Sequence, residues 1–295
     1  MDTAFTYFDK VSQLGSIRKA AETLNVSPSS VSRQIDKLEH MFEAPLIIRH
    51  AKGVKLTPEG EVLARFTRSR SRELHRVRAS IDALKGLHRG HVTIYTVEGT
   101  IGWMLPQAIA SFSKRHPQIT YDVRVAGTDG VMAAIAEDMG DIGISFHPLP
   151  RSDVEVIASI VQPLLAVMSP SHPFAERRQV SLAELTDQPV ALPDRSFGIR
   201  HLIDHASATE QLGINVRLET NSIDMLRQFV LQEMGIAFLP GFSFEQELIS
   251  QRLVGVPIDD AILGQAKTQV CKHAEIDLTP AADGFVKTIL ETFAL

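Results

Sequence analysis

The sequence predicts a multidomain α+β chain with an N-terminal winged helix-turn-helix, a long linker helix and a C-terminal α/β domain of two lobes. Three observations support this fold class. Residues 15–39 read as two short helices joined by a tight turn, basic residues are concentrated in the first third, and strands alternate with helices after Gly90. A length of 295 residues also exceeds what a single core usually supports, which favours several domains.

Charge is divided unevenly along the chain. Residues 1–89 contain 16 Lys and Arg against 10 Asp and Glu, whereas residues 90–295 contain 14 against 25. Positive charge in one region suits contact with phosphates, and an acidic remainder limits non-specific binding. The distribution favours nucleic acid as a partner of the first third, although a basic run alone is also typical of a solvated face.

Composition indicates an ordinary globular protein of the cytoplasm. The hydrophobic share of 44% is typical of a packed core, and no run of about eighteen apolar residues is present, so no contact with a membrane is expected. The start MDTAFTYFDK lacks the basic and apolar regions of a signal peptide. The single cysteine, Cys271, excludes an internal disulfide and a two-cysteine switch, and we expect it to be a buried strand residue.

The first two helices are expected before residue 25. Apolar residues at helical spacing predict a helix that ends near Gly15, namely Phe5, Phe8, Val11 and Leu14. Ser16 is a suitable N-cap for a second helix with the buried residues Ile17, Ala20, Ala21 and Leu24. Asn25 and Val26 then form the turn.

Residues 28–39 are predicted to be a recognition helix. Ser27 is its N-cap, Pro28 stands at the first helical position, and the buried stripe is Val31, Ile35 and Leu38. Short polar and basic side chains on the other faces suit base edges and phosphates. The expected DNA contacts are therefore Ser27, Pro28, Ser29, Ser30, Ser32, Arg33 and Lys37. The alternative for this pattern is an ordinary helical hairpin inside a core.

A basic hairpin follows and favours the DNA-binding interpretation. The segment LIIRHAKGVKLTPEG, residues 46–60, has two short apolar runs around Lys52 and Gly53. Its tip carries the basic residues Arg49, His50, Lys52 and Lys55. A wing of this kind can lie along the phosphate backbone, so Arg49, Lys52 and Lys55 are added to the expected DNA contacts.

The segment from Pro58 to about His88 is predicted to be one long helix. It contains no further proline, and at about 1.5 Å per residue it would be roughly 45 Å long. A short coiled-coil seam is formed by Leu74, Val77, Ile81 and Leu84. A packed surface helix with solvated arginines is the alternative, but an unpartnered helix of this length would be marginal, which favours a dimerisation helix.

The N-terminal pattern FDKVSQLGSIRKAAETLNVSPSSVSRQIDKLEHMFEAPLIIRHAKGVKLTPEG resembles the LysR-type transcriptional regulators. The specific elements are A-A-x-x-L-x-V-S, S-R-Q-I-x-x-L-E and L-T-x-x-G, and weaker similarity covers the rest of the chain. The resemblance implies DNA contacts near Ser29, Ser32 and Arg33. Members often have Gln-Pro where this chain has Pro28-Ser29, so the base contact of that glutamine does not carry over.

After Gly90 the hydrophobic period changes and predicts parallel β-α-β units in two sets. The first set comprises HVTIYTV, WMLPQAIASFSKRHP, ITYDVRVA, GVMAAIAEDMG and DIGISF, and the second comprises PLLAVMS, VSLAELTDQPVAL, NVRLET, IDMLRQFVLQEMG and IAFLP. The resemblance implies a periplasmic-binding-protein-like effector domain of two lobes with a cleft between them. We expect domains at residues 1–58, 59–89 and 90–295, with lobe I at about 91–161 and 267–295 and lobe II at about 162–266.

Effector contacts are expected at strand ends and helix N-termini that face the cleft. Candidates from lobe I are Glu98, Gly99, Thr100, Ile101, Thr128, Ser145, Phe146 and His147. Candidates from lobe II are Arg195, Ser196, Phe197, Gly198, Thr220 and Asn221. Arg195 and Arg200 could bind a carboxylate, and Phe146 and Phe197 could cover an apolar body, so a small carboxylate is the favoured effector.

Other chemistry gains little support from the sequence. His201 and His205 are four residues apart but lack the H-E-x-x-H pattern, so surface histidines are favoured over a metal site, and no cofactor is expected. No Walker loop, G-x-G-x-x-G or G-x-S-x-G motif is present. The alternative function is a solute-binding protein or α/β enzyme with a helical appendage. We favour a non-enzymatic regulator that binds double-stranded DNA as a homodimer or homotetramer and contacts RNA polymerase.

Overall fold

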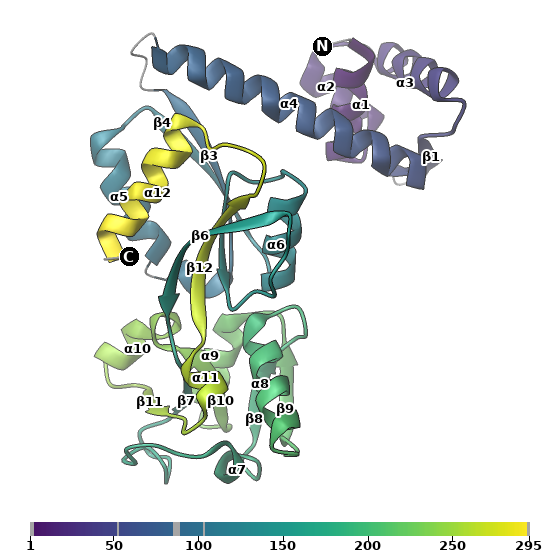
Figure 1. Cartoon of the computed structure of the whole chain (residues 1–295). Coiled ribbons are helices and arrows are strands. Elements are labelled where there is room, and N and C mark those ends of the chain that lie inside the picture. The colour runs from purple at the N-terminus through teal and green to yellow at the C-terminus, as the bar shows by residue number, and fades with distance from the viewer. Residues whose placement is uncertain (1–2, 52, 85–88, 103, 294–295) are drawn as a thin grey trace. The chain divides into compact units, whose positions relative to one another are not determined.

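The computed structural model describes residues 3–51, 53–84, 89–102 and 104–293 (Figure 1). The chain forms two compact units, residues 1–78 and 79–295, and the boundary between them falls within helix α4. Each unit has its own buried core, so the two are described separately.

The first unit is a winged helix-turn-helix. Its elements are α1 (Thr3–Leu14), α2 (Ile17–Leu24), α3 (Pro28–Phe42), β1 (Ile47–His50), β2 (Gly53–Leu56) and α4 (Pro58–Leu84). The predicted caps are confirmed, because Ser16 accepts a hydrogen bond from the Lys19 N–H and Ser27 accepts one from the Ser30 N–H. Asn25 ends α2 in the left-handed conformation with φ of 55°. The predicted stripe of Val31, Ile35 and Leu38 is fully buried.

The wing is anchored to the turn between α1 and α2. Strands β1 and β2 pair antiparallel, and the Val54 N–H donates to the Gly15 carbonyl at 2.8 Å. Gly53 has a φ of +138°, and a Cβ at this position would lie 2.5 Å from the Gly15 oxygen. A side chain at residue 53 would therefore push the wing off the helical core.

Helix α4 contains 27 residues and ends at Leu84. The sequence predicts that it continues to about His88, but residues 85–88 lie outside the described part of the chain.

Lobe I of the second unit is built on a mixed sheet in the order β4-β3-β5-β12-β6. The strands are β3 (Gly90–Thr96), β4 (Ile119–Val125), β5 (Ile142–Phe146), β6 (Val154–Val161) and β12 (Lys267–His273). The helical elements are η1 (Glu98–Thr100), α5 (Met104–Arg115), α6 (Thr128–Ala136) and α12 (Pro280–Phe293). Strands β3, β4 and β5 are parallel as predicted, whereas β12 pairs antiparallel with both β5 and β6.

Lobe II repeats this plan with a sheet in the order β11-β7-β10-β8-β9. The strands are β7 (Leu164–Met168), β8 (Val190–Pro193), β9 (Val216–Thr220), β10 (Ile236–Pro240) and β11 (Val254–Pro257). The helical elements are α7 (Leu182–Leu185), α8 (Gly198–Thr209), α9 (Ile223–Leu231), η2 (Gly241–Ser243), α10 (Glu245–Ile249) and α11 (Ala261–Gly264). The two-lobed α/β architecture that the resemblance implies is thereby confirmed.

The chain passes between the lobes twice, through β6 and β12, which run side by side in Figure 1. Lys267 pairs with Val161, and the Gln162 N–H donates to the Ala266 carbonyl at 2.7 Å. The two crossing segments are thus bonded to each other where they leave lobe I.

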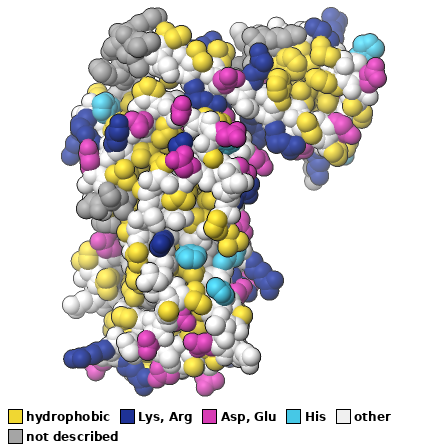
Figure 2. Space-filling model, in the orientation of Figure 1, with side chains coloured by type: hydrophobic (Ala, Val, Ile, Leu, Met, Phe, Trp, Pro, Cys, Tyr) yellow, Lys and Arg dark blue, Asp and Glu magenta, His cyan; other side chains and the backbone are white. Residues whose placement is uncertain are grey.

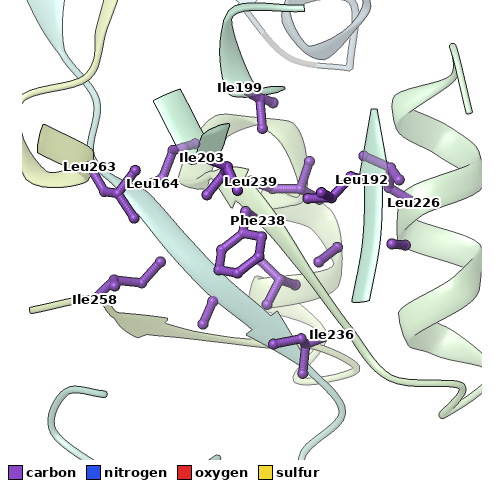
Figure 3. Packing of buried hydrophobic residues seen from close by; sticks show 14 of the residues in the cluster. Leu164, Leu192, Ile199, Ile203, Leu226, Ile236, Phe238, Leu239, Ile258 and Leu263 are labelled. Atoms are coloured by element: carbon purple, nitrogen blue, oxygen red, sulfur yellow. The ribbon is translucent and has the colours of Figure 1, made fainter. Parts of the chain in front are cut away.

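The largest core fills lobe II. Phe238, on the central strand β10, is fully buried and belongs to the same hydrophobic cluster as Leu164, Ile203 and Leu226 (Figure 3). Among the described residues, no helix combines the length and the apolar character needed to span a membrane.

Candidate functional site

Helix α3 presents a polar and basic surface opposite its buried stripe. Of the predicted DNA contacts, Ser27, Pro28, Ser29, Arg33 and Lys37 are exposed, while Ser30 and Ser32 are half-buried. Figure 2 shows Lys and Arg side chains on the surface of this unit. Arg33 makes no hydrogen bond or ion pair with any described residue, so its guanidinium is available to an external partner.

Three serine hydroxyls meet at the start of α3. The Ser27 Oγ lies 2.9 Å from the Ser29 Oγ and 2.8 Å from the Ser30 Oγ. The Ser29 and Ser30 hydroxyls retain donor or acceptor capacity after these bonds, because a hydroxyl has one proton and two lone pairs. The Ser27 hydroxyl also accepts from the Ser30 N–H, so its capacity is fully used. The helix start therefore offers hydrogen-bonding groups of both kinds at the surface.

Arg49 connects the wing to α3. Its guanidinium donates to the Ser32 Oγ at 3.0 Å and to the Asp36 carboxylate at 3.1 Å. The side chains of Arg49 and Asp36 are 52% and 58% exposed, so the pair contributes little to stability and mainly fixes position. Lys55 is exposed on β2, and the predicted contact Lys52 lies outside the described residues.

The predicted seam of α4 is apolar and uncovered. Leu74, Val77 and Ile81 are 42%, 50% and 45% exposed. The side chain of Leu84, the fourth predicted seam residue, lies outside the described part.

The cleft between the two lobes is closed in this structure. It encloses a cavity of about 10 Å³, room for roughly one water molecule. The lining comes from both lobes and is mostly apolar: Val97, Gly99, Thr128, Phe146, Phe197, Gly198, Ile199, Ile223, Pro240, Phe242 and Ser243. The structure thus brings together five of the predicted residues, Gly99, Thr128, Phe146, Phe197 and Gly198.

Several lining residues were not predicted. Phe242 and Ser243 follow strand β10, and the ring of Phe242 lies 6.4 Å from that of Phe146. The run IAFLP was recognised as a strand, and the rule that ligands gather at strand ends would also have pointed to the following GFS.

Hydrogen bonds join the two lobes at the cleft. The Glu98 carboxylate of lobe I accepts bonds from Ser222, Ile223 and Asp224 of lobe II. The Thr128 hydroxyl donates to the Phe146 carbonyl and accepts from the Gly198 N–H, while the Asp129 N–H donates to the Ser196 carbonyl.

The remaining predicted residues lie outside the cavity lining. Thr100 is buried, and its hydroxyl lies 2.6 Å from that of Thr96. Ser145 is also buried, and its hydroxyl has no partner among the described residues. The exposed residues of this group are Ile101, Arg195 and Asn221, whereas Thr220 is half-buried.

The suggestion that Arg200 binds a carboxylate ligand is wrong. Its guanidinium is buried and already donates to Asp204 at 2.8 Å, to Glu219 at 2.7 Å and to the Pro193 carbonyl. Two carboxylates of the same lobe neutralise it, so no charge is left for an effector.

Histidines gather near the cleft without forming a metal site. Burial, followed by the nearby charges of Lys267, His201 and His205, lowers the pKa of His147. The His201 Nε2 lies 2.7 Å from the Arg195 carbonyl. In the described parts of the chain, no three His, Cys, Asp or Glu side chains are arranged to hold a metal ion.

Cys271 is a fully buried residue of β12, as predicted. Burial raises the pKa of its thiol to about 12. The reactive thiolate is therefore nearly absent at neutral pH.

Two family models match the chain. The bacterial regulatory helix-turn-helix protein, lysR family, matches residues 3–61, and the LysR substrate binding domain matches residues 85–294. The RuBisCO operon transcriptional regulator of Allochromatium vinosum is 25% identical over 287 residues, covering 97% of this chain and 94% of its own. The HTH-type transcriptional activator CmpR of Synechocystis is 23% identical over 255 residues, covering 86% and 84%.

Solved structures share the fold at low sequence identity. A full-length OxyR variant from Pseudomonas aeruginosa has a TM-score of 0.75 at 18% identity and covers 98% of this chain and 94% of its own. Full-length CbnR complexed with its target DNA has a TM-score of 0.67 at 16% identity and covers 98% of each chain. The regulatory domain of Synechocystis CcmR in complex with 2-PG has a TM-score of 0.62 at 18% identity, covering 69% of this chain and 97% of its own.

Proposed function

Since the chain belongs to the LysR family of bacterial transcriptional regulators, we propose that α3 and the wing read a specific DNA site and that a small molecule between the lobes controls the outcome. The chain is a DNA-binding regulator with an effector-binding domain, and its relatives are regulators, not enzymes. The observation that carries the DNA-reading proposal is the exposed face of α3, with Ser29, Arg33 and Lys37 beside a buried stripe.

Arg33 is the side chain that we assign to DNA recognition. A guanidinium can bind guanine with two parallel hydrogen bonds or hold a phosphate, and Arg33 has no competing partner among the described residues. Arg49 is assigned a different role, because it is already bound to Ser32 and Asp36 and so holds the wing against α3.

Binding of the full chain to DNA selected from a random pool tests this assignment. Arg33→Ala should weaken specific binding by about 1–3 kcal/mol if Arg33 reads a base. If Arg33 holds a phosphate, Arg33→Ala should weaken binding to all DNA sequences by a similar amount. The slope of log affinity against log salt concentration should then become shallower by about one. Arg178→Ala removes an exposed arginine of lobe II and serves as the control. Equal affinity of Arg33→Ala and the control would contradict the assignment.

We propose that α4 pairs with α4 of a second copy to form a homodimer, and that effector domains join dimers into a homotetramer that bends DNA. The exposed seam of Leu74, Val77 and Ile81 supports the pairing, because such residues are normally covered by a partner helix. Changes in the bend would alter contact with RNA polymerase. A protein that acts on transcription in this way works in the cytoplasm, where bacterial DNA lies.

We further propose a small effector, with a carboxylate as the favoured class. Solved neighbours include the effector-binding domain of QuiR in complex with shikimate and the regulatory domain of CcmR in complex with 2-PG. Thermal unfolding of the full chain against a panel of carboxylates tests this, since a ligand of the folded state raises the midpoint with the logarithm of its concentration. A saturable rise with one compound would identify the class, and a rise only with non-acidic compounds would exclude carboxylates.

A further inference from the structure

Glu98 forms a bridge from lobe I to lobe II. It opens η1 directly after strand β3, and its carboxylate reaches the start of α9. The Ile223 N–H donates to one carboxylate oxygen at 2.7 Å, and the Asp224 N–H and the Ser222 hydroxyl lie 3.1 Å from the other. All three bonds therefore connect residues of different lobes.

The partners of Glu98 make this contact strong. The first N–H groups of a helix have no acceptor within the helix, and the helix dipole favours a negative charge beside them. Hydrogen bonds to a carboxylate are also about twice as strong as those between neutral groups. Since the contact is partly buried, solvent screens it less than an exposed ion pair.

A second contact joins the lobes on another side of the cleft. The Gly198 N–H of lobe II donates to the Thr128 hydroxyl of lobe I at 2.9 Å, and the Asp129 N–H donates to the Ser196 carbonyl at 3.1 Å. The lobes are thus bonded at two separate points.

Glycines allow the lobes to approach closely at both points. A Cβ on Gly99 would lie 2.5 Å from the Ser243 Oγ, and a Cβ on Gly127 would lie 2.4 Å from the Ser196 Oγ. A Cβ on Gly198 would lie 1.9 Å from the Phe146 oxygen. The two atoms of each pair belong to different lobes, so the closed arrangement depends on the absence of a side chain at each of these glycines.

We propose that Glu98 is an internal latch that holds the two lobes of the effector unit closed until a ligand enters. This inference rests on the proposed function, in which the cleft binds the effector. A cavity of about 10 Å³ is far too small for a metabolite, since ligand pockets measure about 300–1,000 Å³. The lobes must separate to admit a ligand, and the bonds from Glu98 to α9 lie across the gap that opens.

The latch also sets the sensitivity of the sensor. Because a ligand can bind only the open fraction of molecules, the apparent dissociation constant is the intrinsic constant divided by that fraction. Weakening the latch should raise the open fraction and tighten apparent binding, although the ligand need not contact Glu98.

Hydrogen exchange measured by NMR on the full chain tests the latch directly. The Ile223 and Asp224 N–H groups donate to Glu98, so their protection reports this contact. Glu98→Ala should speed their exchange at least tenfold, and Glu98→Gln should have a smaller effect because one amide oxygen remains. Glu275→Ala removes an exposed carboxylate elsewhere in lobe I and should leave both amides unchanged.

Chemical rescue separates the latch from a general loss of folding. Sodium acetate should slow exchange of the two amides in Glu98→Ala, because acetate supplies the missing carboxylate, whereas sodium chloride at equal ionic strength should not. The Val190, Ala191 and Leu192 amides of β8 should remain protected in all variants if the lobe itself stays folded.

A steric variant opens the latch without removing Glu98. Gly198→Ala should force the lobes apart, because its Cβ would lie 1.9 Å from the Phe146 backbone oxygen, and should speed exchange of the Ile223 and Asp224 amides. Gly102→Ala is the matched control, since a Cβ there meets no atom within 4 Å.

The latch is overturned if the two amides exchange equally fast in Glu98→Ala and Glu275→Ala, or if Gly198→Ala matches Gly102→Ala. If the Ile223 and Asp224 amides exchange faster in Glu98→Ala but DNA binding responds to no small molecule, the latch is supported and effector control is contradicted. If these amides stay slow in Glu98→Ala although an effector is proven, effector control is supported and the latch is contradicted.

Discussion

The start of α3 and the interlobe cleft both contain hydroxyl side chains, which are exposed at α3 and buried in the cleft. At α3, Ser27, Ser29 and Ser30 bond to one another at the surface. In the cleft, Thr128 is buried and bonded to backbone groups of both lobes. The exposed Ser29 hydroxyl can therefore bind a partner and keep its bond to Ser27, whereas Thr128 and Glu98 must give up bonds between the lobes when the cleft opens.

This difference separates the two binding functions that we propose. The α3 surface is exposed before DNA binds, so its affinity for DNA depends on the contacts that form. The cleft is filled by its own residues, so its affinity for an effector also depends on the contacts between lobes that break.

The strongest test of this separation concerns the cores. Phe238→Ala should lower the stability of the second unit by about 3–5 kcal/mol, because it leaves a cavity in the centre of the lobe II core. Since the core of the first unit contains only residues 4–64, its unfolding transition should not shift. Calorimetry of the full chain measures both transitions.

The control for this variant is Ile249→Ala, because Ile249 is 76% exposed and its truncation should change stability by less than about 0.5 kcal/mol. An equal shift of both transitions in Phe238→Ala would show that the two units unfold together.

A smaller effect is expected at high pH from Cys271. Its thiol has a pKa of about 12 in the fold against 9.0 for an ordinary thiol, because burial disfavours the thiolate. The unfolded chain therefore loses this proton first, and the related stability is complete below pH 9.0 and decreases above it. Between pH 8 and pH 10, wild type should lose about 1.4 kcal/mol more than Cys271→Ala in urea unfolding. Parallel pH profiles would show that the thiol does not contribute.

The smallest effects compare two N-cap serines. Ser27→Ala should reduce the stability of the first unit by about 1 kcal/mol, because the Ser30 N–H loses its side-chain acceptor and keeps only the Ser27 carbonyl. Ser222→Ala should reduce the stability of the second unit by more, since it loses the Met225 cap and a bond to Glu98. Urea unfolding measures both, and an equal loss would show that the Glu98 bond adds nothing to the cap.

Much of the fold was predictable because it depends on neighbouring residues. Ser27, Pro28, Val31, Ile35 and Leu38 mark the start and the buried face of α3, and the structure confirms each. The three parallel strands of lobe I were also predicted. Strands β6 and β12 come from distant parts of the chain and pair antiparallel with each other, and no local period indicates that pairing.

The position of the cleft was predictable from the sequence, but the hydrogen bonds and ion pairs around it were not. Strand ends and helix starts pointed to Gly99, Thr128, Phe146, Phe197 and Gly198, and all five line the cavity. Arg200 looked like a ligand for an anion, because the sequence does not show that Asp204 and Glu219 both reach it.

The sequence by itself determined the N-terminal helices, their caps and their buried faces, because these depend on spacing within a few residues, and its motifs indicated the resemblance to the LysR family. The tertiary structure decided that the cleft is closed and which groups close it. Glu98 and Ser222 are 124 positions apart, and only the folding of two sheets onto two crossing strands brings the carboxylate to the start of α9.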